Sequence, residues 1–510
     1  MGIMAREIRA QQNQSVIGLF RALKADPAAL PRSRPFYRRL VEMVERGVAR
    51  QELPSGFRMP PERDLARALR VSRATVVAAY RELEARGIVR AYVGRGTFVC
   101  ARPDPGSAPF SWRGKVSASA LQSADSTVRD LVANAADPSL ASFAAGTPAL
   151  ECFPTDALRA AIDTILTRDP MAAVKLGPTE GQPRFRAAIA ERFGGSPENI
   201  LVLAGAQQGL DLLARCLVDP GDAVIVDRPG YLGAISSFRC AGARLVGWDV
   251  LRADLDELEE LVLRYRPKVM YLTPTHQNPT GTTLPIRARR ELLELAERYR
   301  MPIIEDDTYR ELTLSSPPPP SLYELDELNT IVIHLNSFAK MLAPGLRLGW
   351  ISAVPAIVEQ LALIKQRVDP QTQNLAQLSV AQLIETGAFD RHLGTLRGEH
   401  RRRRDAMVKA LRQHVPAGRL RFSVPEGGLY LWCQLPTVRA KDAQREAFRD
   451  RVVFLPGEAF YVDRGGTHEL RVCYTAQPPE RAPQAAQALA RSIAAVEKRG
   501  QTEPALVSLA

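Results

Sequence analysis

The chain has 510 residues, of which 45% are hydrophobic and 24% charged, and its formal net charge is +12. This composition is typical of a globular protein with a sizeable core, and the length allows more than one domain. No stretch approaches the roughly 20 apolar residues of a membrane span, and the N-terminus lacks the apolar core of a signal peptide, so we expect a cytoplasmic protein. The six cysteines form no CxxC pair, which argues against a disulfide framework and a zinc site.

Residues 1–33 are an N-terminal lead, and residues 34–100 form a compact unit with most of the basic surplus. Between Arg34 and Arg102 there are fifteen arginines, no lysine and seven acidic residues. A local surplus of this kind suggests a partner that carries phosphates. A solvated, arginine-rich surface explains the charge equally well.

Three helices and a hairpin are expected in this unit, over residues 34–50, 62–70, 73–86 and 88–99. Apolar residues recur at helical spacing in the first helix. Pro61 suits the start of the second helix, Ser72 is a good N-cap for the third, and Gly87 ends it. The hairpin turns around Gly94 and Gly96.

This order of elements predicts a winged helix-turn-helix, whose third helix enters the major groove of DNA. Ser72, Arg73 and Thr75 stand at the N-terminus of that helix, where base edges are usually contacted. Arg63 and Arg95 are candidate phosphate contacts on the second helix and at the tip of the wing. The alternative is a three-helix interaction module that binds no DNA.

The unit resembles the GntR family of bacterial regulators. The resemblance rests on residues 61–66, 71–76 and 94–97, with Tyr80, Leu83 and Gly87 between them. It covers nearly the whole unit and implies a reader of double-stranded DNA.

Residues 101–140 are rich in small residues, with Pro, Gly and Ser at their start, and we interpret them as a linker. In residues 141–500 short β-rich stretches alternate with longer helical patterns, which predicts a mainly parallel sheet covered on both faces. Longer helices and fewer strands after about residue 375 predict a smaller α+β subdomain. The predicted fold class is therefore a multidomain chain, a winged helix-turn-helix followed by a large α/β domain with a C-terminal α+β subdomain.

Two ionisable residues follow apolar strands of the large domain. Lys340 comes after residues 330–335, where burial would lower the amine pKa and make the amine a nucleophile. Asp306 comes after residues 301–305 and could pair with a protonated ring nitrogen. Taken singly, such a lysine is more often a side chain that extends to solvent, and such an aspartate a helix cap.

Further polar residues occur at comparable places. Ala206 and Gln207 open a helix after a glycine, where backbone N–H groups bind phosphate, and Ser337 and Arg347 flank Lys340. The remaining candidates are Tyr231, Asn278, Tyr309 and Arg471. Arg471 lies within an apolar strand, where it needs either a ligand carboxylate or an internal salt bridge.

In order and character these segments resemble the fold-type I aminotransferases, over about residues 141–495. The resemblance implies pyridoxal phosphate as cofactor, with Lys340 as its Schiff-base lysine and Asp306 as partner of the ring nitrogen. By the same resemblance Tyr231 stacks on the ring and Arg471 binds a substrate or effector carboxylate. Asn278 and Tyr309 hold the ring oxygen, and the phosphate is held by Ala206, Gln207, Ser337 and Arg347. A homodimer is also implied, because the active site of that family forms at a dimer interface.

A GntR-like reader joined to an aminotransferase-like domain resembles the MocR subfamily of regulators. That resemblance implies a transcription regulator in which an amino acid or amine effector displaces Lys340 from the cofactor and thereby alters DNA binding. Gly233 stands where some members that sense ω-amino acids carry an arginine, which disfavours an effector of the γ-aminobutyrate type. We expect the large domain to act as a sensor without physiological aminotransferase turnover, because the DNA-binding unit would otherwise have no signal to respond to.

Two alternatives stay open from the sequence. The chain could be a catalytically active pyridoxal-phosphate-dependent aminotransferase with an attached DNA reader, or its large domain could be a dimerisation scaffold without cofactor. Residues 401–404 form a run of four arginines in an expected helix, for which a solvated helix face is favoured over an extra DNA contact.

Overall fold

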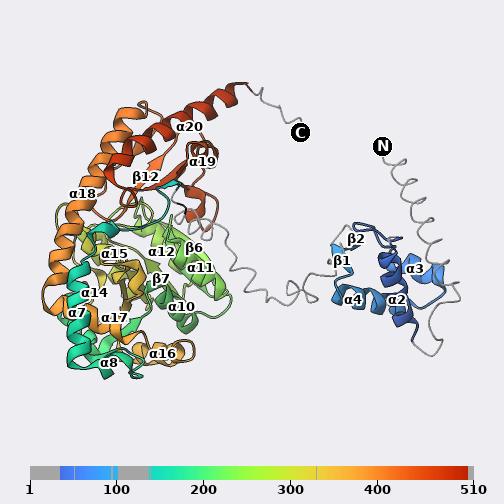
Figure 1. Ribbon diagram of the computed structural model, residues 1–510, viewed down its shortest axis with the longest axis horizontal. Coiled ribbons are helices and arrows are strands. Elements are labelled where there is room, and N and C mark those ends of the chain that lie inside the picture. The colour runs from blue at the N-terminus through green and yellow to red at the C-terminus, as the bar shows by residue number, and fades with distance from the viewer. Residues whose placement is uncertain are drawn as a thin grey trace. The chain divides into compact units, whose positions relative to one another are not determined.

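The computed structural model describes residues 35–50, 52–92, 96–100, 137, 139–328 and 330–502. The chain divides into two compact units, residues 1–117 and 118–510. Figure 1 draws the helices and strands of the first unit in blue and those of the second from cyan to red.

In its described residues, 35–100 with gaps at 51 and 93–95, the N-terminal unit has three helices and an antiparallel hairpin (Figure 1). They are α2 (Phe36–Ala49), α3 (Glu62–Leu69), α4 (Arg73–Ala85), β1 (Val89–Tyr92) and β2 (Gly96–Val99). The Ser72 hydroxyl caps α4 by accepting from the Thr75 N–H at 3.2 Å. Buried Leu and Val side chains from the three helices and both strands form one core. The predicted winged helix-turn-helix is therefore confirmed.

A seven-stranded sheet forms the centre of the C-terminal unit. Its strands stand in the order β4-β10-β9-β8-β7-β5-β6, and β10 runs antiparallel to both of its neighbours while the other pairs are parallel. The strands are β4 (Ile200–Leu203), β5 (Ala223–Arg228), β6 (Arg244–Asp249), β7 (Val269–Leu272), β8 (Ile303–Asp306), β9 (Val332–Ser337) and β10 (Gly349–Ser352).

Helices cover both faces of this sheet, as the near-continuous apolar strands require. In β5, Val224 and Val226 pack with α10 (Ala206–Leu217) and α11 (Leu232–Cys240). Ile225, between them, packs on the opposite face with α12 (Leu255–Tyr265) and α13 (Ile286–Arg298). The other helices of this part are α7 (Thr155–Arg168), α8 (Pro170–Val174), α9 (Pro183–Phe193), α14 (Leu322–Leu325), α15 (Phe338–Met341), α16 (Pro355–Gln366) and α17 (Asn374–Glu385).

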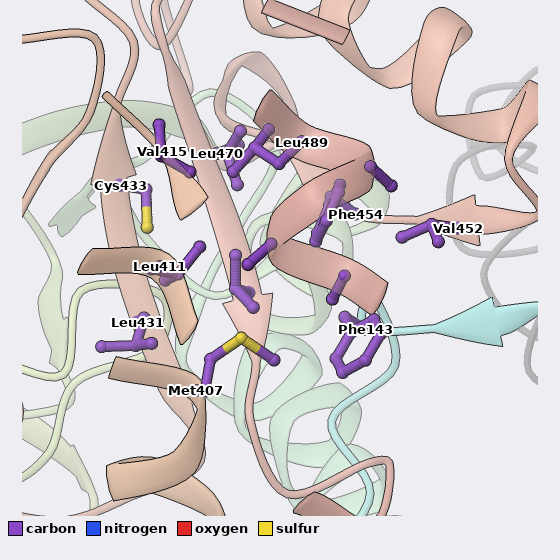
Figure 2. Packing of buried hydrophobic residues seen from close by; sticks show 14 of the residues in the cluster. Phe143, Met407, Leu411, Val415, Leu431, Cys433, Val452, Phe454, Leu470 and Leu489 are labelled. Carbon is purple, nitrogen blue, oxygen red and sulfur yellow. The ribbon is translucent and has the colours of Figure 1, made fainter. Parts of the chain in front are cut away.

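A smaller α+β subdomain follows, as the sequence predicts. Its antiparallel sheet has the order β11-β12-β15-β14. Met407 and Leu411 from a long helix and Leu489 from the last helix pack against Leu431 and Leu470 from the sheet (Figure 2). The elements are α18 (Ala388–His414), β11 (Arg421–Phe422), β12 (Tyr430–Gln434), α19 (Ala440–Arg449), β13 (Val452–Val453), β14 (Leu455–Pro456), β15 (Glu469–Cys473) and α20 (Ala482–Thr502).

The first described residues of the C-terminal unit join this small subdomain rather than the large sheet. β3 (Ala141–Ser142) pairs in parallel with β13. Phe143 then stacks on Phe454 with ring centroids 6.1 Å apart (Figure 2). The chain thus enters the unit along the small subdomain before it reaches the large one.

Candidate functional site

A cavity of about 110 Å³ lies at the carboxyl edge of the large sheet. Parallel strands bring their carboxyl ends to one edge, which is where open α/β sheets bind ligands. The nine residues predicted to hold a cofactor all line this cavity, together with Thr273, Thr308 and Ala339. The nine are Ala206, Gln207, Tyr231, Asn278, Asp306, Tyr309, Ser337, Lys340 and Arg347.

Lys340 lies in α15, directly after β9, and its Nζ donates to the carbonyl oxygen of Gly146 at 2.6 Å. Burial is the largest cause that lowers the pKa of this amine to about 8, and the nearby guanidinium groups of Arg471 and Arg347 act in the same direction. About a tenth of the amine is therefore neutral at pH 7, and only the neutral amine is a nucleophile.

Asp306, at the end of β8, is a buried carboxylate held by two hydroxyl groups. Tyr271 Oη donates to its Oδ2 at 2.8 Å, and Thr308 Oγ1 donates to its Oδ1 at 2.6 Å. Burial raises the pKa of Asp306, and these hydrogen bonds act against that rise. A cation in the cavity would favour the charged form of this carboxylate, which is the behaviour required of a partner for a protonated ring nitrogen.

Asn278 and Tyr309 lie next to each other on the wall of the cavity. Asn278 Nδ2 donates to Tyr309 Oη at 3.1 Å, and Arg471 Nη1 donates to Asn278 Oδ1 at 2.8 Å. The Tyr309 and Tyr430 hydroxyl oxygens lie 3.3 Å apart. These contacts connect the cavity to Arg471, which lies just behind its lining.

The start of α10 and the Arg347 guanidinium face the same end of the cavity. Gly205, with φ of +93°, precedes α10, and a Cβ there would lie 2.8 Å from Arg347 Nη2, so this close approach requires glycine. The Gln207 side chain donates to Ser237 Oγ at 2.9 Å. The backbone N–H groups of α10, rather than the Gln207 amide, are thus the donors available to an anion.

Arg471, on β15, is buried with only 4% of its surface exposed. Its Nη2 donates to the Ala144 carbonyl at 2.5 Å, its guanidinium stacks on the Tyr430 ring at 4.1 Å, and its Nε has no hydrogen-bond partner. Among the ion pairs of the described residues none includes Arg471, so the internal salt bridge considered from the sequence is not seen there. A buried N–H without a partner favours an anionic ligand.

On the N-terminal unit, the four described DNA-contact candidates lie around the start of α4. Arg63, Ser72 and Arg73 are exposed and Thr75 is partly buried. The Ser72 and Thr75 hydroxyl oxygens are 2.8 Å apart, and Arg73 forms a surface ion pair with Glu62 at 3.0 Å. Arg95, the fifth candidate, lies outside the described residues.

Comparison with known proteins covers both units of the chain. The model of aminotransferase class I and II matches residues 141–489, and that of the gntR family of bacterial regulatory proteins matches residues 36–99. A probable rhizopine catabolism regulatory protein, MocR of Rhizobium meliloti, is 31% identical over 387 residues, covering 75% of this chain and 78% of that protein. The chain belongs to the MocR subfamily of GntR-type regulators.

Other relatives of this MocR-type regulator include enzymes as well as regulators. A 2-aminoadipate transaminase of Thermus thermophilus is 36% identical over 390 residues, covering 76% of the regulator and 98% of the enzyme. The uncharacterised HTH-type regulator YdfD of Bacillus subtilis is 28% identical and covers 86% of the chain and 93% of its own length. The solved structure of LysN, an α-aminoadipate aminotransferase of Thermus thermophilus in complex with N-(5'-phosphopyridoxyl)-L-leucine, matches with a TM-score of 0.72 and 35% identity, over 76% of this chain and 100% of its own.

Pyridoxal phosphate is the cofactor of this domain class, and the residues of the MocR-type regulator fit it. Lys340 supplies a primary amine, Asp306 a buried carboxylate, and α10 with Arg347 a set of donors for a phosphate. The unpartnered Arg471 Nε–H could in addition bind an anion. In the part of the chain that the structure describes, no cluster of three or more His, Cys, Asp or Glu side chains could hold a metal ion. Nor is any helix of that part long and apolar enough to cross a membrane.

The sequence missed the groups that hold the predicted residues in place. Thr308 stands only two residues after Asp306 and could have been found as a local side-chain contact. Tyr271 lies on the neighbouring strand β7, and Gly146 and Ala144 present backbone carbonyls from a distant segment. No local pattern marks these three, because strand order and domain packing bring them to the site.

Proposed function

We propose that this DNA-binding regulator senses an amino acid or a related amine through pyridoxal phosphate held at Lys340. In this proposal residues 34–100 bind DNA, residues 101–140 form the linker between the two domains, and residues 141–500 bind the cofactor and the effector. The observation that carries it is one cavity lined by a nucleophilic lysine and a buried carboxylate, with a buried arginine that has a free N–H just behind the lining, bonded to Asn278. Because the same chain carries a GntR-type DNA-binding domain, binding of a ligand in this cavity could regulate DNA binding.

Pyridoxal phosphate supplies an aldehyde that condenses reversibly with a primary amine and releases water. Lys340 provides that amine in the absence of effector, and its lowered pKa keeps part of it neutral. Asp306 pairs with the ring nitrogen, Asn278 and Tyr309 bind the ring oxygen, and Tyr231 covers one face of the ring. The α10 N–H groups, Ser337 and Arg347 bind the phosphate.

Arg471 selects effectors that carry a carboxylate as well as an amine. Its unpartnered Nε and the adjacent Nη2 present a planar pair of donors that matches a carboxylate. Gly233 leaves no room for a longer side chain, because a Cβ there would overlap Gln207 Oε1 and the Tyr231 ring. We therefore expect α-amino acids to be favoured over ω-amino acids.

The DNA contacts proposed are Ser72, Arg73 and Thr75 at base edges and Arg63 and Arg95 at phosphates. Arg73 is exposed and can exchange its partner, since a surface ion pair of the Arg73–Glu62 type contributes little, about 0–1 kcal/mol. The Ser72 hydroxyl already caps α4 and also lies 2.8 Å from the Thr75 hydroxyl, so both hydroxyl groups would contact DNA in addition to these interactions.

The test is the visible absorption spectrum of the purified chain with pyridoxal phosphate, recorded while α-amino acids, amines and taurine-like compounds are added. We expect a stable cofactor band that shifts saturably with one class of compound, and a change in affinity for DNA selected by the protein from a random pool. A protein that stays colourless with added cofactor would contradict the proposal.

A second candidate function is turnover as an aminotransferase. It is favoured by the intact cavity and by the similarity to a 2-aminoadipate transaminase over 98% of that enzyme's length. The two functions differ in stoichiometry. Steady production of a keto acid, far beyond one equivalent per chain, would establish turnover, whereas a single equivalent of spectral change would support sensing.

A further inference from the structure

The backbone of residues 139–146 accepts hydrogen bonds from Lys340 and from Arg471, the side chains that the proposal assigns to the cofactor aldehyde and to the effector carboxylate. Lys340 Nζ donates to the Gly146 carbonyl at 2.6 Å, and Arg471 Nη2 donates to the Ala144 carbonyl at 2.5 Å. The two acceptors are two residues apart in the chain, although the donors come from α15 and β15. The segment therefore meets the site at the two points that the proposed function assigns to cofactor and effector.

The same segment is fixed to the small subdomain. The Ala141 N–H donates to the Arg451 carbonyl at 2.8 Å, and the Phe143 N–H donates to the Val453 carbonyl at 2.8 Å. Arg451 Nε in turn donates to the Ser139 carbonyl at 3.2 Å. The segment 139–146 thus contains the short strand β3 and is hydrogen-bonded to the small subdomain, and its N-terminal end leads directly to the linker.

Apolar packing adds a second connection between the segment and Arg471. Leu140 and Ala144 belong to one buried cluster with Leu455 and Phe460. The Phe460 ring lies 4.9 Å from the Arg471 guanidinium. A displacement of Arg471 therefore displaces this cluster as well as the Ala144 carbonyl, because close-packed interiors transmit small displacements.

We propose that residues 139–146 transmit the occupancy of the ligand site to the linker that joins the DNA reader. This inference rests on the proposed function. Lys340 donates to Gly146 as an amine. A neutral imine nitrogen has no N–H, so covalent attachment of Lys340 to the cofactor would remove that hydrogen bond. A carboxylate that accepts from the Arg471 Nε–H also accepts from the neighbouring Nη2. We expect this second hydrogen bond to replace the one that Nη2 donates to the Ala144 carbonyl.

The two carbonyls consequently respond to different events. The Gly146 carbonyl loses its donor when the cofactor is attached, and regains it when an effector frees Lys340. The Ala144 carbonyl loses its donor when an effector carboxylate arrives. Gly146 must be glycine for this arrangement, since a Cβ would overlap Tyr430 Oη.

The test is hydrogen exchange of peptides spanning residues 137–147 in the full chain, with pre-formed cofactor conjugates that need no reaction. The probes are N-(5'-phosphopyridoxyl)glycine, which carries a carboxylate, and N-(5'-phosphopyridoxyl)methylamine, which does not. We expect the glycine conjugate to change exchange at the Ala141 and Phe143 amides by about fivefold, as for loss of one hydrogen bond, and the methylamine conjugate to change it much less. Equal effects of the two conjugates, or none, would overturn the inference.

A control separates transmission from a merely structural role. Thr475 Oγ1 donates to the Thr147 carbonyl at 2.7 Å, next to the segment but outside the cavity lining. Thr475→Val should raise basal exchange of the segment and leave its response to the glycine conjugate intact. Arg471→Gln should abolish that response.

The second readout is the rate at which trypsin cleaves the linker at Arg129. We expect this rate to change with the glycine conjugate in the unaltered chain and in Arg445→Ala, whose arginine pairs on the surface with Asp442. In Arg451→Ala, which loses the contact with Ser139, the change should be reduced severalfold. Exchange that responds in the segment without any response at Arg129 would refute transmission.

Failure of this inference is distinguishable from failure of the proposed function. A spectral shift and an altered DNA affinity with no change in residues 139–146 would refute transmission and leave sensing intact. Absence of a spectral shift with every amine would instead refute sensing, whichever way the conjugates affect the segment.

Discussion

At the scale of single residues, Lys340 has the most direct test. Replacing it by alanine removes the amine that the proposal assigns to the cofactor, and the DNA reader is a separate compact unit. We expect Lys340→Ala to lose the visible band of attached cofactor while its fold and basal DNA affinity persist. Lys365→Met is the matched control, because that buried lysine donates to the Thr179 carbonyl outside the cavity lining. Loss of all DNA binding in Lys340→Ala would contradict this separation of roles.

The lowered pKa of Lys340 sets a pH dependence. Protonated amine does not attack an aldehyde, so the rate of cofactor attachment to the free protein should rise with pH and level off above about 8. Below that pH, each unit lowers the neutral fraction, and with it the rate, by about tenfold. Stopped-flow absorption across this range measures the profile. A rate that climbs without a plateau to pH 10 would indicate an ordinary lysine.

Tyr271 is the residue whose role the sequence did not reveal. Its hydroxyl donates to Asp306, and Tyr271→Phe leaves a buried carboxylate oxygen with one donor fewer. A hydrogen bond to a charged group contributes about 1.5–3 kcal/mol, so we expect pyridoxal phosphate affinity to fall by at least about tenfold. Tyr299→Phe removes a comparable hydrogen bond to Glu259 at the surface and should leave the affinity unchanged. Equal affinities of the two variants would refute the role of Tyr271.

At the scale of elements, the proposed function assigns the reading of DNA to α4. Arg73 stands at its first position and is exposed, with 57% of its side chain accessible. If it contacts a base, Arg73→Ala should weaken binding to selected DNA by about 1–3 kcal/mol, with a smaller effect on random DNA. Arg81→Ala, further along the same helix, serves as a comparison. Unchanged affinity for selected DNA would refute the assignment of Arg73.

In the long helix α18, the exposure of a run of arginines could not be predicted from the charge pattern alone, because it depends on tertiary contacts. The sequence favoured a solvated face for its four consecutive arginines, yet Arg403 and Arg404 are only 3% and 9% exposed. Arg403 donates to the Thr475 carbonyl, and Arg401 and Arg404 donate to the Leu314 and Pro425 carbonyls. These arginines connect the helix to neighbouring segments, because backbone carbonyls there accept their hydrogen bonds.

At the scale of the whole molecule, the resemblance to fold-type I aminotransferases predicts a homodimer. One chain has a mass of 56.1 kDa, so sedimentation or light scattering should give twice that mass. A dimer would also present two DNA readers, and affinity for DNA with two half-sites should exceed that for one. A monomeric mass at micromolar concentration, with the cofactor still bound, would contradict the prediction.

The sequence by itself determined the order of the elements and nine of the twelve residues that line the cavity. Helix caps, apolar periodicity and strand-end motifs are local signals, and they identified α3, α4, Lys340 and Asp306. Tertiary structure alone decided which groups hold those residues. Tyr271 and Asp306 are 35 residues apart, Gly146 and Lys340 are 194 apart, and Ala144 and Arg471 are 327 apart. Such contacts depend on strand order and subdomain packing, which no local pattern encodes.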